Sequence, residues 1–463
     1  MKSQFGWSLV ATVTGNLVQL ISFFFIAKDI GPELFGLFTF ALVFFGFASI
    51  YQDVGVSAYI IKERVTDKKD LNSIYLLTLT LSLLIFSALF VVAFHSDKGK
   101  VFQYVLYAMS LNFPILALGL VNKSILEMES RFDSISKIEI ISSLLAGTIS
   151  ITLLYLGFSV YSLVFLGLTK SAFNTFGYNK YGRYRFSLSD GFNSSIYIKA
   201  LRFSWGIIGF NTINYFGRNA DKYFISKNLG DYWLGGYSLA YRFLTYPLQI
   251  ITQVVSRVLY PRLSSIYGTK EFSKTVLNVI YLLSSLFFPI FSLGIAINKD
   301  VILLFLGSDW EFISEIVTIL CLIGAVQVLG CMSGPIFMAS GKTKWMFYIG
   351  TINTIIYVIA FYYGSKIDVY TLTTYYMYAN YFVLLPTLMI ISYLSSINFI
   401  CLCLTITVPI LFSFLNYTLI EIYKEELGIM GYGTISIVQT MCISLLLIYI
   451  MRLNIKSENG NEN

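Results

Sequence analysis

The segment FFIAKDIGPELFGLFTFA (residues 24–41) occurs a second time in this chain, as YFISKNLGDYWLGGYSLA (residues 223–240). The two copies align without gaps at an offset of 199 residues, and most of their non-identical pairs are chemically similar. The identical pairs are Phe25/Phe224, Ile26/Ile225, Lys28/Lys227, Gly31/Gly230, Gly36/Gly235 and Ala41/Ala240. Each copy joins two long apolar runs, so each is predicted to form a turn between two membrane spans. Internal duplication of this kind is typical of transporters.

The composition is that of a membrane protein. The chain has 463 residues, of which 56% are hydrophobic and 12% are charged, whereas an average soluble domain carries roughly 25% charged residues. The apolar residues fall in runs of about twenty, the length that a helix needs to cross about 30 Å of hydrocarbon. We therefore predict an all-α polytopic membrane protein. The net charge of +7 lies mainly in short loops, so it reports membrane orientation and not nucleic-acid binding.

Apolar runs bounded by charged or turn residues predict about fourteen spans. The first six lie near residues 5–27, 35–61, 74–94, 101–121, 138–156 and 159–176. The other eight lie near residues 202–226, 234–259, 276–297, 313–339, 344–364, 369–391, 397–420 and 430–451. An even number of spans places both termini on the same side of the membrane.

The repeat predicts how these spans are grouped. Six spans separate its two copies, and an even number preserves orientation, so the halves are related by an axis along the membrane normal. We predict two six-helix lobes around a central cavity, an arrangement suited to alternating access. The predicted parts are an N-terminal lobe (1–176), a cytoplasmic linker (177–201), a C-terminal lobe (202–391), and two added helices with a cytoplasmic tail (392–463).

The distribution of basic residues predicts the orientation. With the N-terminus in the cytoplasm, twenty of the 32 Lys and Arg residues fall on the inside and seven on the outside, in agreement with the positive-inside rule. The five others fall within predicted spans: Lys170, Arg218, Lys222, Arg242 and Arg257. Lys170 and Arg257 lie nearest to span ends, so we expect them to be interfacial anchors.

Polar and ionisable residues form a stripe along the predicted span 202–226. Asn211, Asn214, Arg218 and Asp221 are separated by three, four and three positions, a spacing that places them on one face of a helix, and Lys222 borders them. Ionisable groups in a bilayer cost roughly 2.5–3.5 kcal/mol each on insertion scales, so they usually face a cavity or a partner. Alternatively, the three charged residues pair locally or extend to the membrane surface.

A second stripe follows the predicted span 234–259. Its members are Ser238, Arg242, Thr245, Gln249, Thr252 and Ser256, with Tyr241 at its border. Arg242 lies about two turns inside the span, which favours a functional role over surface anchoring. Both stripes predict that the second half of the chain lines a water-filled cavity.

The repeat offset relates the four stripe residues of span 202–226 to four residues of the first span. These are Thr12, Gly15, Gln19 and Ser22, which form a small or polar face without charge. We therefore expect Gln19 to line the same cavity from the first half. Asp53 and Asp221 are candidate sites for a coupling ion, H+ or Na+. A carboxylate that caps the end of a helix is the alternative for Asp53.

These residue types indicate what the cavity binds. Arg and Lys suit a phosphate or carboxylate, and Asn, Gln, Ser, Thr and Tyr suit the hydroxyls of a sugar. A single histidine excludes a His-rich metal site, and the five cysteines lack the paired spacing of a zinc site, so we predict no metal, cofactor or catalytic residue. The segment GPIFMASGKT (residues 334–343) lacks the spacing of a nucleotide-binding loop, so ATP is not expected to drive transport.

Two long segments resemble a known family. They are GWSLVATVTGNLVQLISFFFIAKDIGPELFGLFTFALVFFGFASIYQDVGVSAYII (residues 6–61) and FSWGIIGFNTINYFGRNADKYFISKNLGDYWLGGYSLAYRFLTYPLQIITQVVSRVLYPRLSSI (residues 203–266). Both are similar to Wzx-type O-antigen and exopolysaccharide flippases of the multidrug/oligosaccharidyl-lipid/polysaccharide superfamily.

The resemblance implies a bacterial inner-membrane protein that moves undecaprenyl-diphosphate-linked oligosaccharides to the periplasmic leaflet for O-antigen, capsule or exopolysaccharide assembly. It implies a cationic cavity, onto which Arg218, Lys222 and Arg242 map, although the first lobe supplies few cations. The implied partners are the lipid-linked oligosaccharide, membrane lipids, a polysaccharide polymerase and a chain-length regulator. Export of lipid II or of drugs by the same superfamily remains an alternative. A polymerase is disfavoured because such enzymes usually carry a large periplasmic loop.

Overall fold

The computed structural model is helical throughout almost all of the residues that it describes. These residues are 2–53, 55–187, 190–193, 195–254, 259–426 and 429–460. No strand occurs among them, which confirms the predicted all-α class. The chain forms two compact units, Met1–Gly235 and Gly236–Asn463, and each is described by itself. The boundaries predicted from the repeat, with a linker at residues 177–201, stay a prediction.

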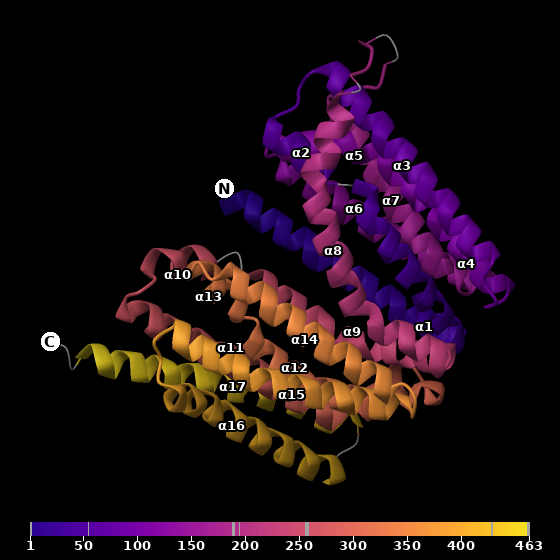
Figure 1. The fold of residues 1–463 in the computed structure, drawn as a ribbon. Coiled ribbons are helices and arrows are strands. Elements are labelled where there is room, and N and C mark those ends of the chain that lie inside the picture. The colour runs from indigo at the N-terminus through magenta and orange to yellow at the C-terminus, as the bar shows by residue number, and fades with distance from the viewer. Residues whose placement is uncertain are drawn as a thin grey trace. The chain divides into compact units, whose positions relative to one another are not determined.

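The first unit is built from the indigo to magenta helices of Figure 1. They are α1 (Lys2–Asp53), α2 (Val56–Glu63), α3 (Lys68–Phe94), α4 (Lys100–Ser110), α5 (Asn112–Met128), α6 (Phe132–Leu153), the π-helix η1 (Leu154–Phe158), α7 (Tyr161–Tyr181), α8 (Ser195–Asn228) and the first turn of α9 (Asp231–Val254). Helix α6 packs between α1 and α7, and α5 packs between α3 and α7. Helix α8 returns to α1, so the start of the second half of the sequence is part of this unit.

The second unit contains the rest of α9 and the helices that follow. They are α10 (Tyr260–Ile266), α11 (Lys270–Phe305), η4 (Ser308–Trp310), α12 (Ile313–Gly330), α13 (Ser333–Ala339), α14 (Thr343–Gly364), α15 (Val369–Leu394), α16 (Phe399–Glu426) and α17 (Ile429–Gly460). Helix α11 packs against α12, α16 and α17. Buried Asn416 of α16 donates to Ser292 Oγ of α11 and Thr440 Oγ1 of α17, both at 3.0 Å, so the last two helices are fixed to this unit by polar contacts.

Ten helical runs of the described residues are long and apolar enough to cross a membrane. The longest, Gly6–Glu63, has 58 residues, enough for two crossings at 1.5 Å per residue. Gly31 interrupts its helical geometry with φ 76°, and Pro32 follows. In the second copy of the repeat, Gly230 also has positive φ, 98°. Glycine adopts this backbone conformation without steric cost, so both identical glycines form the predicted turns.

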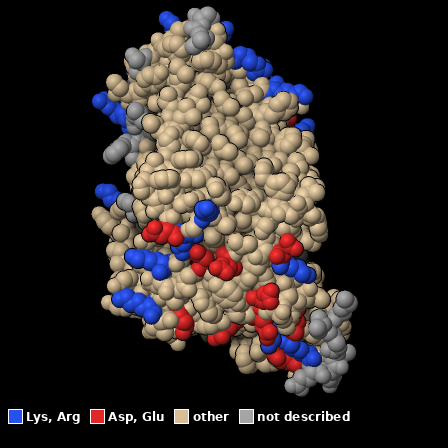
Figure 2. Space-filling view, turned by 90° about the vertical axis from the view of Figure 1, so that its right-hand side faces the viewer, with Lys and Arg blue, Asp and Glu red and all other residues tan. Residues whose placement is uncertain are grey.

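The charge distribution agrees with a membrane protein. Figure 2 shows a broad area of surface without Lys, Arg, Asp or Glu side chains. Large apolar side chains such as Leu84, Phe382 and Leu411 are more than 60% exposed, a pattern that suits contact with lipid and not with water. The chain is therefore a multi-pass membrane protein. The count of fourteen spans stays a prediction, because α7, α8 and α9 are not among the ten runs.

The segment that follows α7 packs onto the first unit. The Tyr184 hydroxyl donates to Asn72 Oδ1 at 2.7 Å, and Tyr184 N–H donates to Asn122 Oδ1 at 3.0 Å. Burial raises the pKa of the Tyr184 hydroxyl, so this hydroxyl stays protonated and remains a donor. The predicted linker is thus held against α3 and α5 over part of its length.

Candidate functional site

The two copies of the repeat contact each other within the first unit. A Cβ atom on Gly36 would overlap the main-chain carbonyl of Asp231, and a Cβ atom on Gly235 would overlap the carbonyl of Pro32. The repeat offset relates Gly36 to Gly235 and Pro32 to Asp231, so the same contact is made twice with the roles exchanged, as at a two-fold interface. We call this contact the glycine crossing. It supports the internal duplication predicted from sequence.

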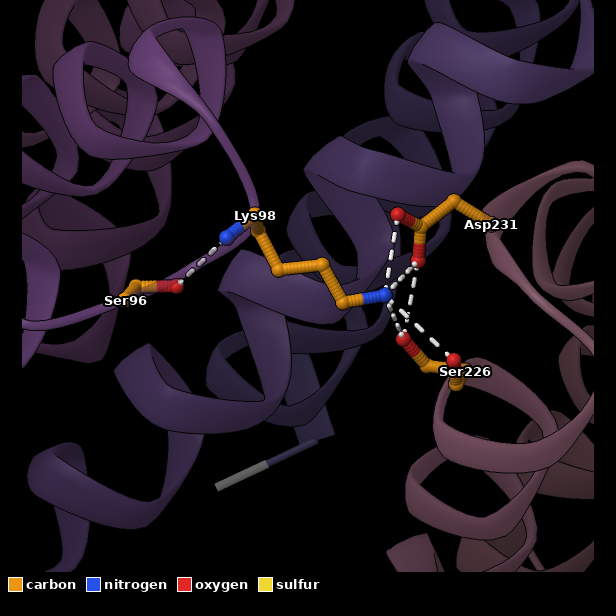
Figure 3. A network of polar contacts seen from close by, with 4 residues as sticks. All are labelled: Ser96, Lys98, Ser226 and Asp231. Atoms are coloured by element: carbon orange, nitrogen blue, oxygen red, sulfur yellow. Dashed lines mark hydrogen bonds and ion pairs between the residues drawn. The ribbon is translucent and has the colours of Figure 1, made fainter.

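A charged network lies beside the glycine crossing (Figure 3). Lys98, in the segment between α3 and α4, donates through Nζ to both carboxylate oxygens of Asp231, at 2.8 and 3.0 Å. Lys98 Nζ also donates to Ser226 Oγ at 2.9 Å, and Ser226 Oγ donates to Asp231 Oδ1 at 2.8 Å. The ammonium lies 5.0 Å from the centroid of the Phe40 ring. We call Lys98, Ser226 and Asp231 the latch, because they join the α3–α4 segment to the turn between α8 and α9.

Contacts with α1 fix the rotation of α8. Tyr215 OH donates to the carbonyl of Val43 at 2.6 Å, and Tyr51 OH lies 3.1 Å from Thr212 Oγ1. Gly46 leaves room for the Tyr215 ring, since a Cβ atom there would lie 2.6 Å from the Tyr215 hydroxyl. Thr212 and Tyr215 therefore face α1, and the predicted polar stripe occupies another side of α8.

The structure divides the α8 stripe into exposed and buried members. Asn211, Asn214 and Arg218 are exposed, whereas Asp221 is only 2% exposed. Lys222 is half-buried, and its Nζ donates to Asn219 Oδ1 at 3.0 Å. Local pairing, the alternative considered for the charged residues, therefore accounts for part of the environment of Lys222, while Arg218 stays accessible.

The α9 stripe also has two environments. Gln249 is exposed, and Arg242 and Thr245 are half-buried. Thr245 Oγ1 donates to the carbonyl of Tyr241, one turn earlier, at 3.0 Å. Ser256 and Arg257 lie outside the described residues.

Tyr241 belongs to a polar cluster inside the second unit. Its hydroxyl lies 3.4 Å from the Tyr376 hydroxyl of α15. Gln327 of α12 donates to the same Tyr376 hydroxyl at 2.9 Å and to Asn380 Oδ1 at 3.1 Å. The position of Tyr241 at the edge of its stripe thus reflects packing against α12 and α15.

Asp53 is the last residue of α1 and connects to the start of α2. Its Oδ1 accepts hydrogen bonds from the Ser57 amide and from Ser57 Oγ, both at 2.9 Å. Ser57 Oγ also lies 2.9 Å from Ser124 Oγ of α5. Ser57 lies in the first turn of α2, whose N-cap is Gly55, so Asp53 is a carboxylate at a helix end, the alternative that the sequence left open for this residue.

The first unit contains a cavity of about 270 Å³ between α1 and α5–α7, with mainly apolar walls and a few polar side chains. Gln19 of α1, Ser143 of α6 and Lys170 of α7 line it. A Cβ atom on Gly15 would lie 3.5 Å from Ser143 Oγ and 3.6 Å from Lys170 Nζ, so both groups rest against the α1 stripe. The prediction that Lys170 is an interfacial anchor is therefore wrong, because its ammonium lies against an inner helix.

The second unit contains a larger cavity, of about 590 Å³, between α11, α12, α15 and α16. Its walls are mainly apolar and include Phe288, Leu322, Leu388, Ile406 and Phe414. No Lys, Arg, Asp or Glu lines this cavity among the described residues. Its chemistry suits a hydrocarbon chain, in contrast to the cation-bearing cavity of the first unit.

With this geometry established, the chain can be compared with known proteins. A family model described as "Polysaccharide biosynthesis protein" matches residues 25–315, more than half of the chain. The chain belongs to this family. It is 26% identical over 371 residues to "Lipopolysaccharide biosynthesis protein WzxC" of Escherichia coli (strain K12), covering 78% of this chain and 74% of that protein. It is 23% identical to "Teichuronic acid biosynthesis protein TuaB" of Bacillus subtilis (strain 168), covering 74% and 72%.

Solved structures show the same fold. The inward closed conformation of "Lipid II flippase MurJ" superposes with a TM-score of 0.75 at 16% identity, covering 96% of this chain and 98% of that one. An inward-facing multidrug resistance MATE family transporter of the MOP superfamily gives a TM-score of 0.60, also at 16% identity, covering 84% and 99%. The predicted resemblance is confirmed: the chain is a polysaccharide biosynthesis protein, and its fold is that of the MurJ flippase and the MATE transporter.

Proposed function

We propose that this chain flips an undecaprenyl-diphosphate-linked oligosaccharide from the cytoplasmic to the periplasmic leaflet, for assembly of O-antigen, capsule or exopolysaccharide. The observation that carries the proposal is a pair of mainly apolar cavities, one of which contains a lysine. In the first unit Lys170 and a few amide and hydroxyl groups stand in a cavity wall that is otherwise apolar, and the second unit offers about 590 Å³ of mainly apolar space. A cargo with a diphosphate-sugar head and a polyprenyl tail needs both kinds of surface.

Residues of the two stripes supply the remaining contacts. Arg218 is exposed on α8, and Arg242 is half-buried on α9. Guanidinium groups form bidentate hydrogen bonds with phosphate oxygens. Asn211, Asn214 and Gln249 are exposed amides that match sugar hydroxyls. Lys222, Tyr241, Thr245 and Gln19 complete the proposed set.

The proposed topology has fourteen spans, two six-helix lobes, both termini in the cytoplasm, and the bacterial inner membrane as location. Lys28, Lys98 and Lys227 then face the periplasm, so the glycine crossing and the latch lie on the periplasmic side of the first unit. H+ or Na+ is proposed as the coupling ion, with buried Asp221 as a better candidate than Asp53, whose carboxylate accepts hydrogen bonds from Ser57 at the start of α2. A polymerase and a chain-length regulator are proposed as partners.

The experiment is deletion of the gene followed by identification and localisation of the lipid that accumulates. The proposal predicts a lipid-linked oligosaccharide in the cytoplasmic leaflet, and Arg242→Ala should reproduce the loss of surface polysaccharide at normal protein level. Accumulation of an unpolymerised unit in the periplasmic leaflet would favour a polymerase instead. Accumulation of lipid II, or sensitivity to drugs without any trapped lipid, would favour the other exporters of the superfamily.

A further inference from the structure

The cavity inside the first unit has the features of an anion site. We infer that Lys170, Gln19 and Ser143 bind an oxyanion there, a phosphate group being the expected ligand. This inference rests on the proposed function where it takes the phosphate to be that of the cargo. The site itself is independent of which lipid is transported.

The three residues converge from three helices. Gln19 is on α1, Ser143 on α6 and Lys170 on α7, and all three line the same cavity. Gly15, one turn before Gln19, brings the main chain of α1 close to Ser143 Oγ and Lys170 Nζ. Within the described part of the chain, the side chains of these three residues form no hydrogen bond with another residue. Their donors are thus available to a ligand.

The neighbouring polar residues are already engaged. Ser171 Oγ donates to Asn112 Oδ1 at 2.7 Å, and Asn112 Nδ2 donates to the carbonyl of Met109 at 2.9 Å. Glu139, one turn before Ser143 on α6, accepts from the Tyr178 hydroxyl at 3.1 Å. These groups hold α5, α6 and α7 together, so they position the cavity wall instead of binding the ligand.

The cavity has a cation but no anion. Lys170 is the one ionisable residue of its lining, which contains no Asp or Glu among the described residues. Glu139 is close enough to act on Lys170 electrostatically, but the described residues include no ion pair with Lys170. A charge inside a membrane protein is costly unless an opposite charge or hydrogen-bonding partners compensate it. A mobile anion supplies that compensation.

The donors and the volume select the class of ligand. An ammonium, an amide and a hydroxyl offer up to six N–H and O–H donors, and charge-assisted bonds to phosphate oxygens are stronger than neutral ones. A volume of about 270 Å³ lies just below the range of roughly 300–1,000 Å³ that drug-sized ligands occupy. These donors suit a phosphate group, although most of the remaining cavity wall is apolar.

The test measures binding of radiolabelled inorganic phosphate to the full-length chain in lipid nanodiscs by equilibrium dialysis. Lys170→Met should weaken binding at least tenfold, and Lys170→Arg, which keeps the charge, should retain it within about threefold. The matched control is Lys137→Met, because Lys137 is an exposed lysine of α6 in the same unit, and its affinity should be unchanged. Unchanged affinity in Lys170→Met, or no saturable binding to the original chain, would overturn the inference.

Two further arms cover folding and the source of the phosphate. If Lys170→Met is not recovered as a folded protein, Gln19→Leu and Ser143→Ala should each weaken phosphate binding at least threefold, and unchanged affinity in both overturns the site. Undecaprenyl phosphate in the nanodisc should displace the bound phosphate. If it does not, the link to the cargo is overturned and the site binds free phosphate. The deletion experiment tests the proposed function separately, since trapping of the lipid does not depend on any of these affinities.

Discussion

The two copies of the internal repeat make the same main-chain contact, but the residues whose carbonyls take part in it differ. Gly36 lies against the carbonyl of Asp231, and Gly235 lies against the carbonyl of Pro32. The second copy has Asp231 where the first has Pro32, and Asp231 accepts two bonds from Lys98. The backbone contact is therefore symmetric, whereas the ion pair is one-sided.

The contact therefore has two components, the packing of the glycines and the ion pair of the latch. Close approach of helices in a membrane depends on small residues, because van der Waals packing replaces the hydrophobic effect. The glycines fix the distance between the copies, and no larger residue fits at either position. The latch adds an interaction that can break without a steric clash. The crossing thus defines the distance between the two copies, and the latch adds an ion pair beside it.

The largest effect is expected for Gly36→Ala and Gly235→Ala. Each new methyl would overlap a main-chain carbonyl, which cannot move as a side chain can, and overpacking costs typically 1–3 kcal/mol. Both variants should lower thermal stability by a similar amount and reduce surface polysaccharide at least tenfold. Thermal unfolding in detergent and a surface-polysaccharide assay measure this.

Gly209→Ala is the matched control for these two variants. Gly209 is also in a helix, α8, but a Cβ atom there meets nothing within 4 Å. This variant should be neutral or slightly stabilising, since alanine is the better helix former by up to about 1 kcal/mol. If Gly36→Ala were tolerated while Gly235→Ala were not, the two-fold character of the crossing would be disproved.

A smaller effect is expected for Asp231→Asn, which removes the ion pair that only the second copy of the repeat makes. The variant keeps the shape of the side chain but removes the charge that Lys98 binds. The paired side chains are 28% and 15% exposed, so we expect a loss of about 1–2 kcal/mol, between a surface pair and a buried one. The readout uses a chain whose native cysteines are replaced by alanine and whose buried Leu37, next to Gly36, is replaced by cysteine. A thiol reagent should modify this cysteine about five- to tenfold faster in the Asp231→Asn variant than in the chain that keeps Asp231.

Two other variants make this result specific. Pro32→Ala changes the equivalent position of the first copy, where no ion pair exists to lose, and should leave the labelling rate of the Leu37 cysteine unchanged. Asp309→Asn removes an exposed carboxylate of the second unit and should also have no effect. Equal acceleration by Pro32→Ala and Asp231→Asn would show that the latch has no role of its own.

The sequence predicts the helices and the repeat well, because both depend on local patterns. Apolar runs report helices, and the pairs Gly31/Gly230 and Gly36/Gly235 report turns and close contacts that only glycine permits. Three members of the α8 stripe, Asn211, Asn214 and Arg218, are exposed, whereas Asp221 is buried, so a cavity lined by this stripe stays a prediction. The positions of these residues along one helix were available without a structure.

Contacts between distant segments could not be predicted in this way. Lys98 and Asp231 are 133 positions apart. Both lie in turns between predicted spans, where charged residues are common, so neither stands out in the sequence. The sequence places Lys170 near the end of its predicted span, and this position alone predicts a residue at the membrane surface. In the structure α7 packs on α6, and Lys170 lines the same cavity as Gln19. This arrangement depends on the rotation of each helix about its axis, which the periodicity within a single helix does not define.

The smallest effect is expected for Ser226→Ala, which removes the neutral member of the latch. Its hydroxyl donates to Asp231 Oδ1 at 2.8 Å and accepts from Lys98 Nζ at 2.9 Å. A hydrogen bond of this kind contributes about 0.5–1.5 kcal/mol net, and the Lys98–Asp231 pair persists without it. The labelling rate of the Leu37 cysteine should therefore rise about two- to threefold, less than with Asp231→Asn. Combined with Asp231→Asn, the variant should add less than it does alone, because one of the two hydrogen bonds of its hydroxyl goes to the carboxylate and the other to Lys98. Full additivity would show that Ser226 stabilises the α8–α9 turn independently of the Asp231 carboxylate.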